Sequence, residues 1–371
     1  AACHRAQRGG NANGHGHAPK ATEWVGFPAR RSPHLLRPSL GPMRVLAAVD
    51  KFKGTATAAQ VAAAIGHACW ERGHDCVEQP VADGGEGTLE ALGGANRTSV
   101  VTGPLGDPVK AEWRFHRGTA VIEMARASGL TLVGGAARND AMAATTTGTG
   151  ELIDQALDLG AKKIVVCLGG SATTDGGLGC VRAITAPARL RGVQLLVACD
   201  VQTLFTDAAP VFGPQKGATP AQVEMLRGRL ERLAQMYHEQ YGVDVRHLPG
   251  TGAAGGLAGG LVALGGRLMP GFELVADEID LHDKIAAADL VITGEGYLDE
   301  QSFEGKVIGG VQAMCEALDT PVAAIVGDSA PEVAHRIRHR SLVNDFGTDR
   351  AMAEPLWCIE HAALTLLTND I

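Results

Sequence analysis

The chain has 371 residues, of which 45% are hydrophobic, 20% charged and 4% aromatic, and its formal net charge is −8. An acidic balance argues against a nucleic-acid-binding protein, because such domains are usually basic along one face. No apolar run approaches the roughly 18 residues of a membrane span. At about 100–200 residues per domain, the length predicts a globular protein of two domains.

The first 42 residues differ from the rest of the chain. They are rich in Gly, His, Arg and Pro, and Glu23 is their one acidic residue. They contain no apolar core of a secretory signal. His15 and His17 could bind a metal, but the composition favours an unstructured tail. We expect residues 1–42 to be a disordered extension that is not native, with Met43 as the native start.

From Met43 onward, apolar runs alternate with helical patterns. We expect strands at residues 45–49, 76–82, 119–125, 162–168, 193–200, 288–296 and 320–328. We expect helices at residues 55–73, 148–160 and 218–242, and a turn into a helix over residues 83–94. This alternation predicts an α/β fold with largely parallel sheets.

Several predicted strands run into polar, glycine-rich loops. These loops are Asp50–Gly54, Asp83–Gly87, Ser171–Gly177 and Tyr297–Asp299. In parallel sheets, ligands bind beyond the carboxyl ends of the strands. One such loop would be a simple turn, but four of this composition predict a ligand site.

The loops contain the residue types that phosphate chemistry requires. Glycine-rich turns expose backbone N–H groups to anions, and phosphoryl transfer also needs cations for the phosphates and carboxylates for Mg²⁺ and for the acceptor hydroxyl. The candidate cations are Lys51, Lys53, Lys216 and Lys306. The candidate carboxylates are Asp83, Glu86, Asp175, Glu295 and Asp299. Asp175 would serve equally well as an N-cap of the helix that follows, a role compatible with catalysis.

Other signatures are weak or absent. The segment Gly250–Gly255 matches GxGxxG but follows no clear strand, which favours a glycine-packed helix N-terminus over a dinucleotide site. The chain has no P-loop, no HExxH and no GxSxG. Its eight cysteines form no CxxC pair. We expect reduced, mostly buried thiols and a cytoplasmic protein.

Taken together, the motifs resemble the bacterial type I glycerate kinase family over nearly all of residues 43–371. The strings that carry the resemblance occur in the family's order: VDKFKGTATAAQVAAAI, PVADGGEGTLEAL, AVIEMARASGL, TTTGTGELIDQALDLGAKKIVVCLGGSATTDGG, VACDV, VFGPQKGAT, GTGAAGGLAGG and ADLVITGEGYLDEQSFEGK.

The resemblance implies ATP-dependent, Mg²⁺-assisted phosphorylation of D-glycerate at the 2-hydroxyl. It also implies a Rossmann-like domain (residues 43–96 and 235–371), an inserted α/β domain (residues 97–234) and an active site in the cleft between them. The residues alone leave 2- and 3-hydroxyl phosphorylation open. D-Glycerate and ATP are the expected partners, with no nucleic acid and no membrane.

Within that resemblance, charge and position assign the finer roles. The catalytic residues are Asp175, as the general base, and Lys53. The substrate-binding residues are Asp50, Ser171, Asp83, Gly84, Gly85 and Glu86. The nucleotide-binding residues are Gly169, Gly170, Gly176, Gly177, Lys216, Gly294 and Glu295. The metal ligands are Glu295 and Asp299.

The chain also departs from the family pattern. After Gly179 it reaches VACDV several tens of residues early, and a further stretch is missing after Asp328. Tyr297 stands where the family usually has Arg, and a tyrosine carries no cation. An inactive remnant that still binds nucleotide or glycerate is therefore an alternative to an active kinase.

Overall fold

The computed structural model describes residues 41–368, and from Pro42 onward the chain forms one compact unit. Apart from its last two positions, the predicted extension 1–42, with His15 and His17, lies outside the described residues. No helix within residues 41–368 is long and apolar enough to cross a membrane.

The strands form two sheets. They are β1 (Arg44–Val49), β2 (Asp75–Pro80), β3 (Arg97–Thr102), β4 (Pro108–His116), β5 (Thr119–Glu123), β6 (Lys163–Cys167), β7 (Gln194–Ala198), β8 (Arg267–Met269), β9 (Leu290–Leu298), β10 (Val322–Ser329) and β11 (His339–Ser341). The first sheet has the order β11-β10-β9-β1-β2 and is parallel throughout. The second has the order β3-β4-β5-β6-β7-β8, parallel from β5 to β8 and antiparallel at β3-β4-β5.

The α-helices lie between the strands in the chain. They are α1 (Ala58–Glu71), α2 (Thr88–Ala91), α3 (Ala125–Ser128), α4 (Thr147–Asp158), α5 (Leu178–Ala183), α6 (Ala208–Phe212), α7 (Pro220–Tyr241), α8 (Leu257–Ala263), α9 (Gly271–Glu278), α10 (Leu281–Ala286), α11 (Val307–Ala317), α12 (Leu342–Phe346), α13 (Thr348–Ala353) and α14 (Pro355–Thr368). Capping boxes begin α1 and α7, at Thr57 with Gln60 and at Thr219 with Gln222.

The α/β prediction is confirmed, and each strand expected from an apolar run is present. The β3–β4 hairpin, which turns at Gly106 with a positive φ of 99°, was not expected from the sequence. Both strands of this hairpin are partly exposed, so polar residues interrupt their apolar pattern. A continuous apolar run is the mark of a strand buried on both faces, and this hairpin lacks one.

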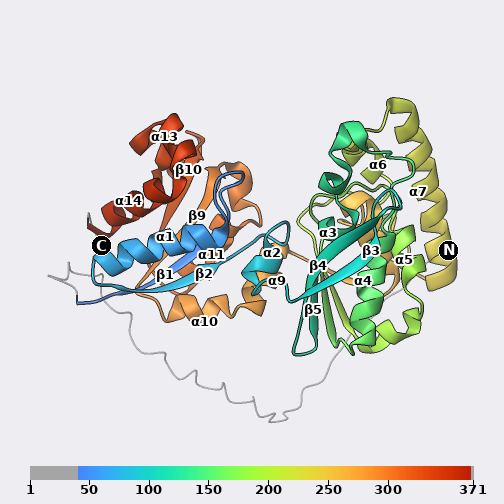
Figure 1. Cartoon of the computed structure of the whole chain (residues 1–371), viewed down its shortest axis with the longest axis horizontal. Helices are drawn as coiled ribbons and strands as arrows, with labels where there is room; N and C mark the ends of the chain where they lie inside the picture. The colour runs from blue at the N-terminus through green and yellow to red at the C-terminus, as the bar shows by residue number, and fades with distance from the viewer. Residues whose placement is uncertain (1–40, 369–371) are drawn as a thin grey trace, which may run out of the picture. The chain divides into compact units, whose positions relative to one another are not determined.

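Helices cover both faces of the first sheet (Figure 1). Val45 and Val49 of β1 pack with α1 and α14 on one face, and Leu46 and Ala48 pack with α9 and α11 on the other. Two helices also connect the cores of the two sheets. Helix α9 places Phe272 in the core of the first sheet and Leu274 in the core of the second. Helix α2 likewise places Ala91 in the first core and Leu89 in the second.

The division into a Rossmann-like and an inserted domain stays a prediction. Its second boundary, at 234/235, falls inside α7, which runs unbroken from Pro220 to Tyr241. Strand β8 pairs with β7 and so belongs to the second sheet. We therefore propose that the chain returns to the first domain after Met269, which leaves residues 43–96 and 270–371 around the first sheet.

The cysteines agree with the prediction of reduced thiols. Within residues 41–368 all are free, and most are buried. Cys3 lies outside the described residues.

Candidate active site

A cavity of about 710 Å³ opens at the carboxyl ends of β1, β2, β6 and β9. It collects many of the residues that the sequence singled out: Asp50, Lys53, Asp83, Gly85, Glu86, Gly169, Gly170, Glu295 and Asp299. Lys51, Tyr297, Lys306 and Asp328 line it as well. Strand ends from both sheets thus contribute to one site, as expected for ligand binding to parallel sheets.

Sheet pairing sets two buried carboxylates side by side. Val49 of β1 is in register with Gly294 of β9, and the Asp50 N–H donates to the Gly294 carbonyl at 2.9 Å. The next residues, Asp50 and Glu295, are both 8% exposed. Burial raises the pKa of Asp50 to about 6, and the charge of Asp83 adds to the rise while Lys51 opposes it.

Glu295 has the most unusual environment in the cavity. Its Oε1 atom is buried and has no hydrogen-bond partner. Burial raises the pKa of Glu295 to about 7; Asp50 and Asp299 also raise it, and Ser302 and Lys306 lower it. A buried carboxylate oxygen without a partner is costly. Such a group indicates that a ligand, a cation or a proton completes the site.

Lysines face these carboxylates. The Lys51 ammonium donates to the Glu86 carbonyl at 2.7 Å and lies 3.6 Å from the Asp50 carboxylate. Lys306 is the N-cap residue of α11, and its charge acts on Glu295. Lys53 lines the same cavity. The site therefore offers positive charge for phosphates next to carboxylates for a metal or a proton.

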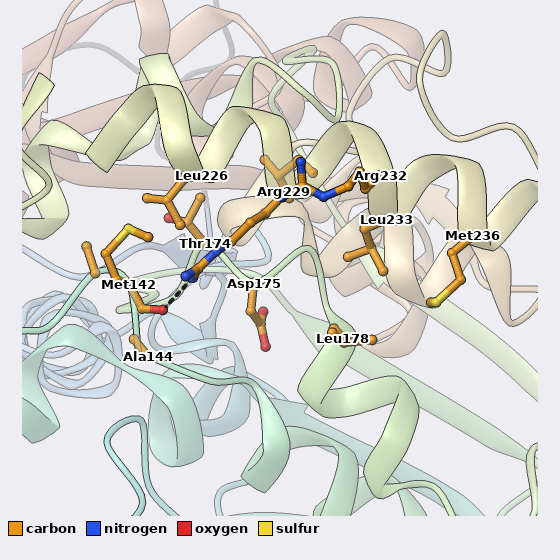
Figure 2. A pocket seen from close by; sticks show the side chains of 12 residues that line it. Met142, Ala144, Thr174, Asp175, Leu178, Leu226, Arg229, Arg232, Leu233 and Met236 are labelled. Carbon is orange, nitrogen blue, oxygen red and sulfur yellow. Dashed lines mark hydrogen bonds between the residues drawn. The ribbon is translucent and has the colours of Figure 1, made fainter. Parts of the chain in front are cut away.

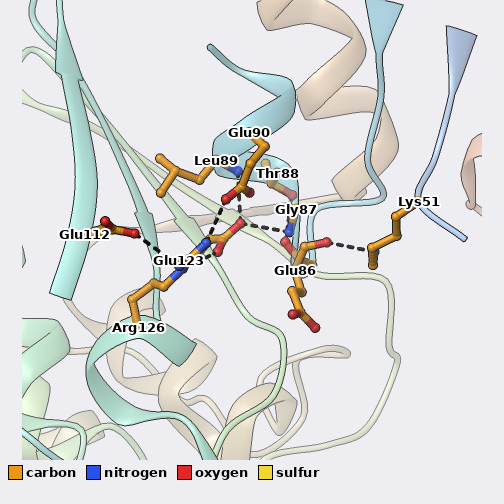
Figure 3. A network of polar contacts seen from close by, with 10 residues as sticks. Lys51, Glu86, Gly87, Thr88, Leu89, Glu90, Glu112, Glu123 and Arg126 are labelled. Atoms are coloured by element: carbon orange, nitrogen blue, oxygen red, sulfur yellow. Dashed lines mark hydrogen bonds and ion pairs between the residues drawn. The ribbon is translucent and has the colours of Figure 1, made fainter. Parts of the chain in front are cut away.

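The loop Asp83–Gly87 forms one wall and depends on glycine for its path. Gly84 has a φ of +84°, and a Cβ there would lie 2.5 Å from the Gly271 Cα. Gly169, from the second sheet, approaches the same loop so closely that a Cβ would lie 3.2 Å from the Glu86 N atom. Figure 3 shows this loop, with Lys51 on one side and Glu123 on the other. These glycines serve close backbone packing.

Asp175 lies elsewhere. It lines a separate pocket of about 320 Å³ beside α7, among apolar side chains such as Leu178 and Leu233 (Figure 2). Its Oδ2 accepts hydrogen bonds from the Thr146 N–H at 2.9 Å, the Thr146 hydroxyl at 2.8 Å and the Gly179 N–H at 3.1 Å. Its Oδ1 accepts from the Gly177 N–H at 3.1 Å.

With three hydrogen bonds on Oδ2 and one on Oδ1, the Asp175 carboxylate joins Thr146, the residue before α4, to the start of α5. Its assignment as general base stays a prediction, and this geometry favours the capping role. Nucleotide binding by Gly176 and Gly177 stays a prediction, and their N–H groups donate to the Gly255 carbonyl and to Asp175 in this structure. A Cβ at Gly176 would lie 2.4 Å from Leu233, so tight packing accounts for the glycine.

Four other predicted residues also lie outside the cavity lining. Ser171 forms a strand bridge with Gly129, and Gly84 packs on Gly271. Gly294 sits inside the first sheet, where a Cβ would lie 2.3 Å from the Ile325 carbonyl. Lys216 is 2% exposed, and its ammonium donates to the Thr173 carbonyl at 2.6 Å. The structure gives these residues roles in packing, and ligand-binding roles for them stay predictions.

Lys216 provides a pH-dependent test of that burial. Burial lowers the pKa of Lys216 to about 7, so between pH 7 and 10.5 the unfolded chain binds more protons, and stability rises with pH. We expect Lys216→Met to raise the free energy of unfolding at pH 7 by about 2–4 kcal/mol and to flatten this pH dependence. Urea unfolding at pH 7 and pH 10 measures both. Lys110→Met, at an exposed site, is the control, and parallel pH curves for Lys216→Met and the unmodified chain would contradict the prediction.

Asp200, just after β7, is an acidic neighbour of the site that the sequence did not single out; it is exposed and does not line the cavity, but its charge interacts with Asp83 and Lys306. Its Oδ1 accepts from the Gly271 N–H at 2.7 Å. Desolvation of its carboxyl group raises the pKa of Asp200 to about 6, the bond to Gly271 lowers it, and the charge of Asp83 raises it further. The signal was present, because LLVACD ends an apolar strand with an aspartate just as VLAAVD does at Asp50.

Buried acidic side chains beside lysines, at the carboxyl ends of parallel strands, are the arrangement that phosphoryl-transfer enzymes use. The sequence model of the glycerate kinase family matches residues 45–189 and 185–366. The chain belongs to the glycerate kinase family, and it is an enzyme of the kinase class.

Individual relatives agree. The glycerate 2-kinase of Escherichia coli K12 is 41% identical over 331 residues, which cover 78% of this chain and 87% of the relative. A glycerate kinase of Bacillus subtilis is 40% identical over 325 residues, 77% of this chain and 85% of the relative. A crystal structure described as a glycerate kinase 2 from Salmonella typhimurium LT2 superposes with a TM-score of 0.77 at 36% identity, covering 88% of this chain and 97% of that chain.

The same comparisons locate the shortened segment. The alignment with the Escherichia coli relative runs over 331 residues, but 78% of this chain is about 290 residues, so about 40 positions have no counterpart here. The two family matches meet at residues 185–189, just after α5. This is where the sequence analysis places a missing stretch. The cavity at the strand ends is formed by other parts of the chain.

Proposed function

We propose that the protein transfers the γ-phosphoryl group of ATP to the 2-hydroxyl of D-glycerate, giving 2-phosphoglycerate and ADP. The observation that carries the proposal is the cavity in which the Glu295 carboxylate, whose Oε1 atom has no hydrogen-bond partner, lies beside Asp50 and near lysines. The name of the Escherichia coli relative, a glycerate 2-kinase, favours the 2-hydroxyl over the 3-hydroxyl.

The carboxylates of the cavity fit Mg²⁺. Glu295 offers a buried oxygen without a partner, and Asp299 lies near enough to raise the pKa of Glu295. No three acidic side chains of this cavity converge tightly enough to hold an ion alone, which suits Mg²⁺, because it usually takes one or two carboxylates together with water and substrate phosphates. Bound there, Mg²⁺ would offset the charge on the β- and γ-phosphates.

The chain's own residues account for the remaining steps. Lys51, Lys53 and Lys306 offset the negative charge of the phosphates and of the glycerate carboxylate. Asp50 accepts the proton of the 2-hydroxyl as that oxygen bonds to the γ-phosphorus and the bond to the β-phosphate oxygen breaks. ADP leaves, and Asp50 releases the proton to water. We assign this role to Asp50 because it lines the cavity with the lysines, whereas Asp175 lies in another pocket and accepts four hydrogen bonds from the protein.

One experiment tests the proposal and its alternatives. The full chain is incubated with ATP, Mg²⁺ and D-glycerate, ADP release is followed by a coupled assay, and the product is identified by phosphorus NMR. We expect turnover at roughly 1–100 s⁻¹ and the 2-phosphate signal. A 3-phosphate signal would identify a 3-kinase. ATP binding without turnover would identify an inactive remnant, the alternative that the shortened segment after α5 motivates.

A further inference from the structure

A buried carboxylate from the second sheet holds the loop that forms one wall of the active-site cavity. Glu123, the last residue of β5, is 3% exposed. Its Oε1 accepts hydrogen bonds from the Gly87 N–H at 3.0 Å and the Leu89 N–H at 2.9 Å. These are N–H groups at the start of α2, which directly follows the loop Asp83–Gly87. Helix α2 has no cap from a side chain of its own N-cap residue, so Glu123 supplies that cap from another part of the fold.

Arg126 keeps Glu123 in place from the other side. Its Nε donates to Glu123 Oε2 at 3.2 Å, its Nη2 donates to Glu90 at 2.8 Å, and its Nη1 donates to Glu112 at 3.3 Å. One guanidinium thus faces three carboxylates, as Figure 3 shows. Arg126 lines a second cavity of about 440 Å³ next to Lys51 and Lys53, but its N–H groups point to protein carboxylates.

The loop Asp83–Gly87 connects Glu123 to residues that line the active-site cavity. The carbonyl of Glu86, one residue before Gly87, accepts the hydrogen bond of the Lys51 ammonium at 2.7 Å. Within the loop, the Gly85 N–H donates to Asp83 at 3.2 Å. Asp83, Glu86 and Lys51 all line the cavity. A shift of the Gly87 backbone would therefore move Lys51 and the Asp83 carboxylate together.

We propose that Glu123, held by Arg126, is a positioning residue for the kinase reaction: it fixes the Asp83–Gly87 loop and, through it, the Lys51 ammonium. Glu123 lines neither the 710 Å³ cavity nor the 440 Å³ cavity. We therefore expect it to act through the loop and not by touching substrate. This inference rests on the proposed function for its kinetic consequence. The structural consequence, an ordered loop, does not depend on that function.

The decisive variant is Glu123→Ala, which removes the acceptor for both N–H groups. We expect amide hydrogen exchange in residues 83–91 to become about tenfold faster, while exchange in the strands of the first sheet stays as it was. Glu123→Gln is the second variant in case alanine prevents folding. Its amide oxygen still accepts from Gly87 and Leu89, but it loses the charged partner of Arg126, so we expect a smaller increase confined to the same segment.

Kinetics then separate positioning from plain stabilisation. Per folded molecule, we expect kcat/KM for D-glycerate to fall about 10–100-fold in Glu123→Ala, because small displacements of catalytic groups are costly. Glu112→Gln is the matched control, since it removes an exposed partner of the same guanidinium, and exposed ion pairs contribute little. We expect it to change kcat/KM less than twofold.

Two results would overturn the proposal. One is unchanged exchange in residues 83–91 of Glu123→Ala. The other is a lower melting temperature in both Glu123 variants with kcat and KM unchanged per folded molecule, which would make Glu123 structural only. If the unmodified chain shows no kinase activity, the proposed function fails, and the exchange measurement still decides whether Glu123 orders the loop.

Discussion

Replacing Asp175 by alanine is expected to lower the free energy of unfolding by about 3 kcal/mol, because it removes the acceptor for four hydrogen bonds at the starts of α4 and α5. Asp175→Asn is expected to destabilise as well. An asparagine can accept from the Thr146 and Gly179 donors with its oxygen, but its NH₂ group would then face the Gly177 N–H. Urea unfolding measures both effects.

The general-base hypothesis predicts a different pattern for the same variants. As a base, Asp175 could be changed to Asn with the fold intact and a loss of about 10²–10⁴ in rate. As a cap, Asp175→Asn loses stability and keeps most of its activity per folded molecule. Asp140→Ala is the control, since Asp140 accepts two backbone hydrogen bonds at an exposed turn, where we expect a cost of about 1 kcal/mol. A stable, inactive Asp175→Asn would restore the base assignment.

Glu295→Gln is expected to reduce kcat by about 10²–10³-fold and to stabilise the protein above neutral pH. Burial raises the pKa of Glu295 to about 7, so the folded chain binds more protons than the unfolded chain between pH 4.5 and 7, and stability falls as pH rises through this window. Glutamine has no charge to bury. We expect the variant to be more stable than the unmodified chain by about 2–3 kcal/mol at pH 8, with no difference below pH 4.

The test combines urea unfolding at several pH values with Mg²⁺ titration. If Glu295 helps to hold the metal, Mg²⁺ alone raises the melting temperature of the unmodified chain at pH 8 more than that of the variant. Glu300→Gln is the matched control, because Glu300 is nearby and exposed and forms an ion pair with Arg336. Equal pH profiles for Glu295→Gln and the unmodified chain would show that this carboxylate is not strained by burial.

The fold was predictable where its strands are buried on both faces. β1, β6 and β7 are nearly continuous apolar runs, and β9 begins with one. The β3–β4 hairpin was not predicted, because its exposed positions interrupt the apolar run. The domain boundary at 234/235 was also placed without knowledge of β8, a strand of three residues whose membership in the second sheet depends on its partner β7.

The active-site residues also fall into those that the sequence could predict and those that it could not. Asp50 and Glu295 could be found from the sequence, because Asp50 directly follows β1, Glu295 lies after the apolar start of β9, and parallel strands bring their carboxyl ends together. Asp175 and Gly176 could not be interpreted in this way. A carboxylate among glycines has the same sequence whether its oxygens face a substrate or backbone N–H groups. Glycine likewise appears both where an anion approaches and where a leucine packs closely.

The order of residues along this chain was therefore enough to establish its fold class, its resemblance to the glycerate kinases and the strand ends that carry its charged groups, because burial and periodicity are properties of neighbouring residues. Which donors reach each carboxylate was decided only in three dimensions. The Glu295 Oε1 atom is left without a partner, the Asp175 oxygens accept four hydrogen bonds near two helix starts, and Glu123 caps a helix 34 residues away in sequence. Such pairings depend on contacts between distant segments, which no local pattern records.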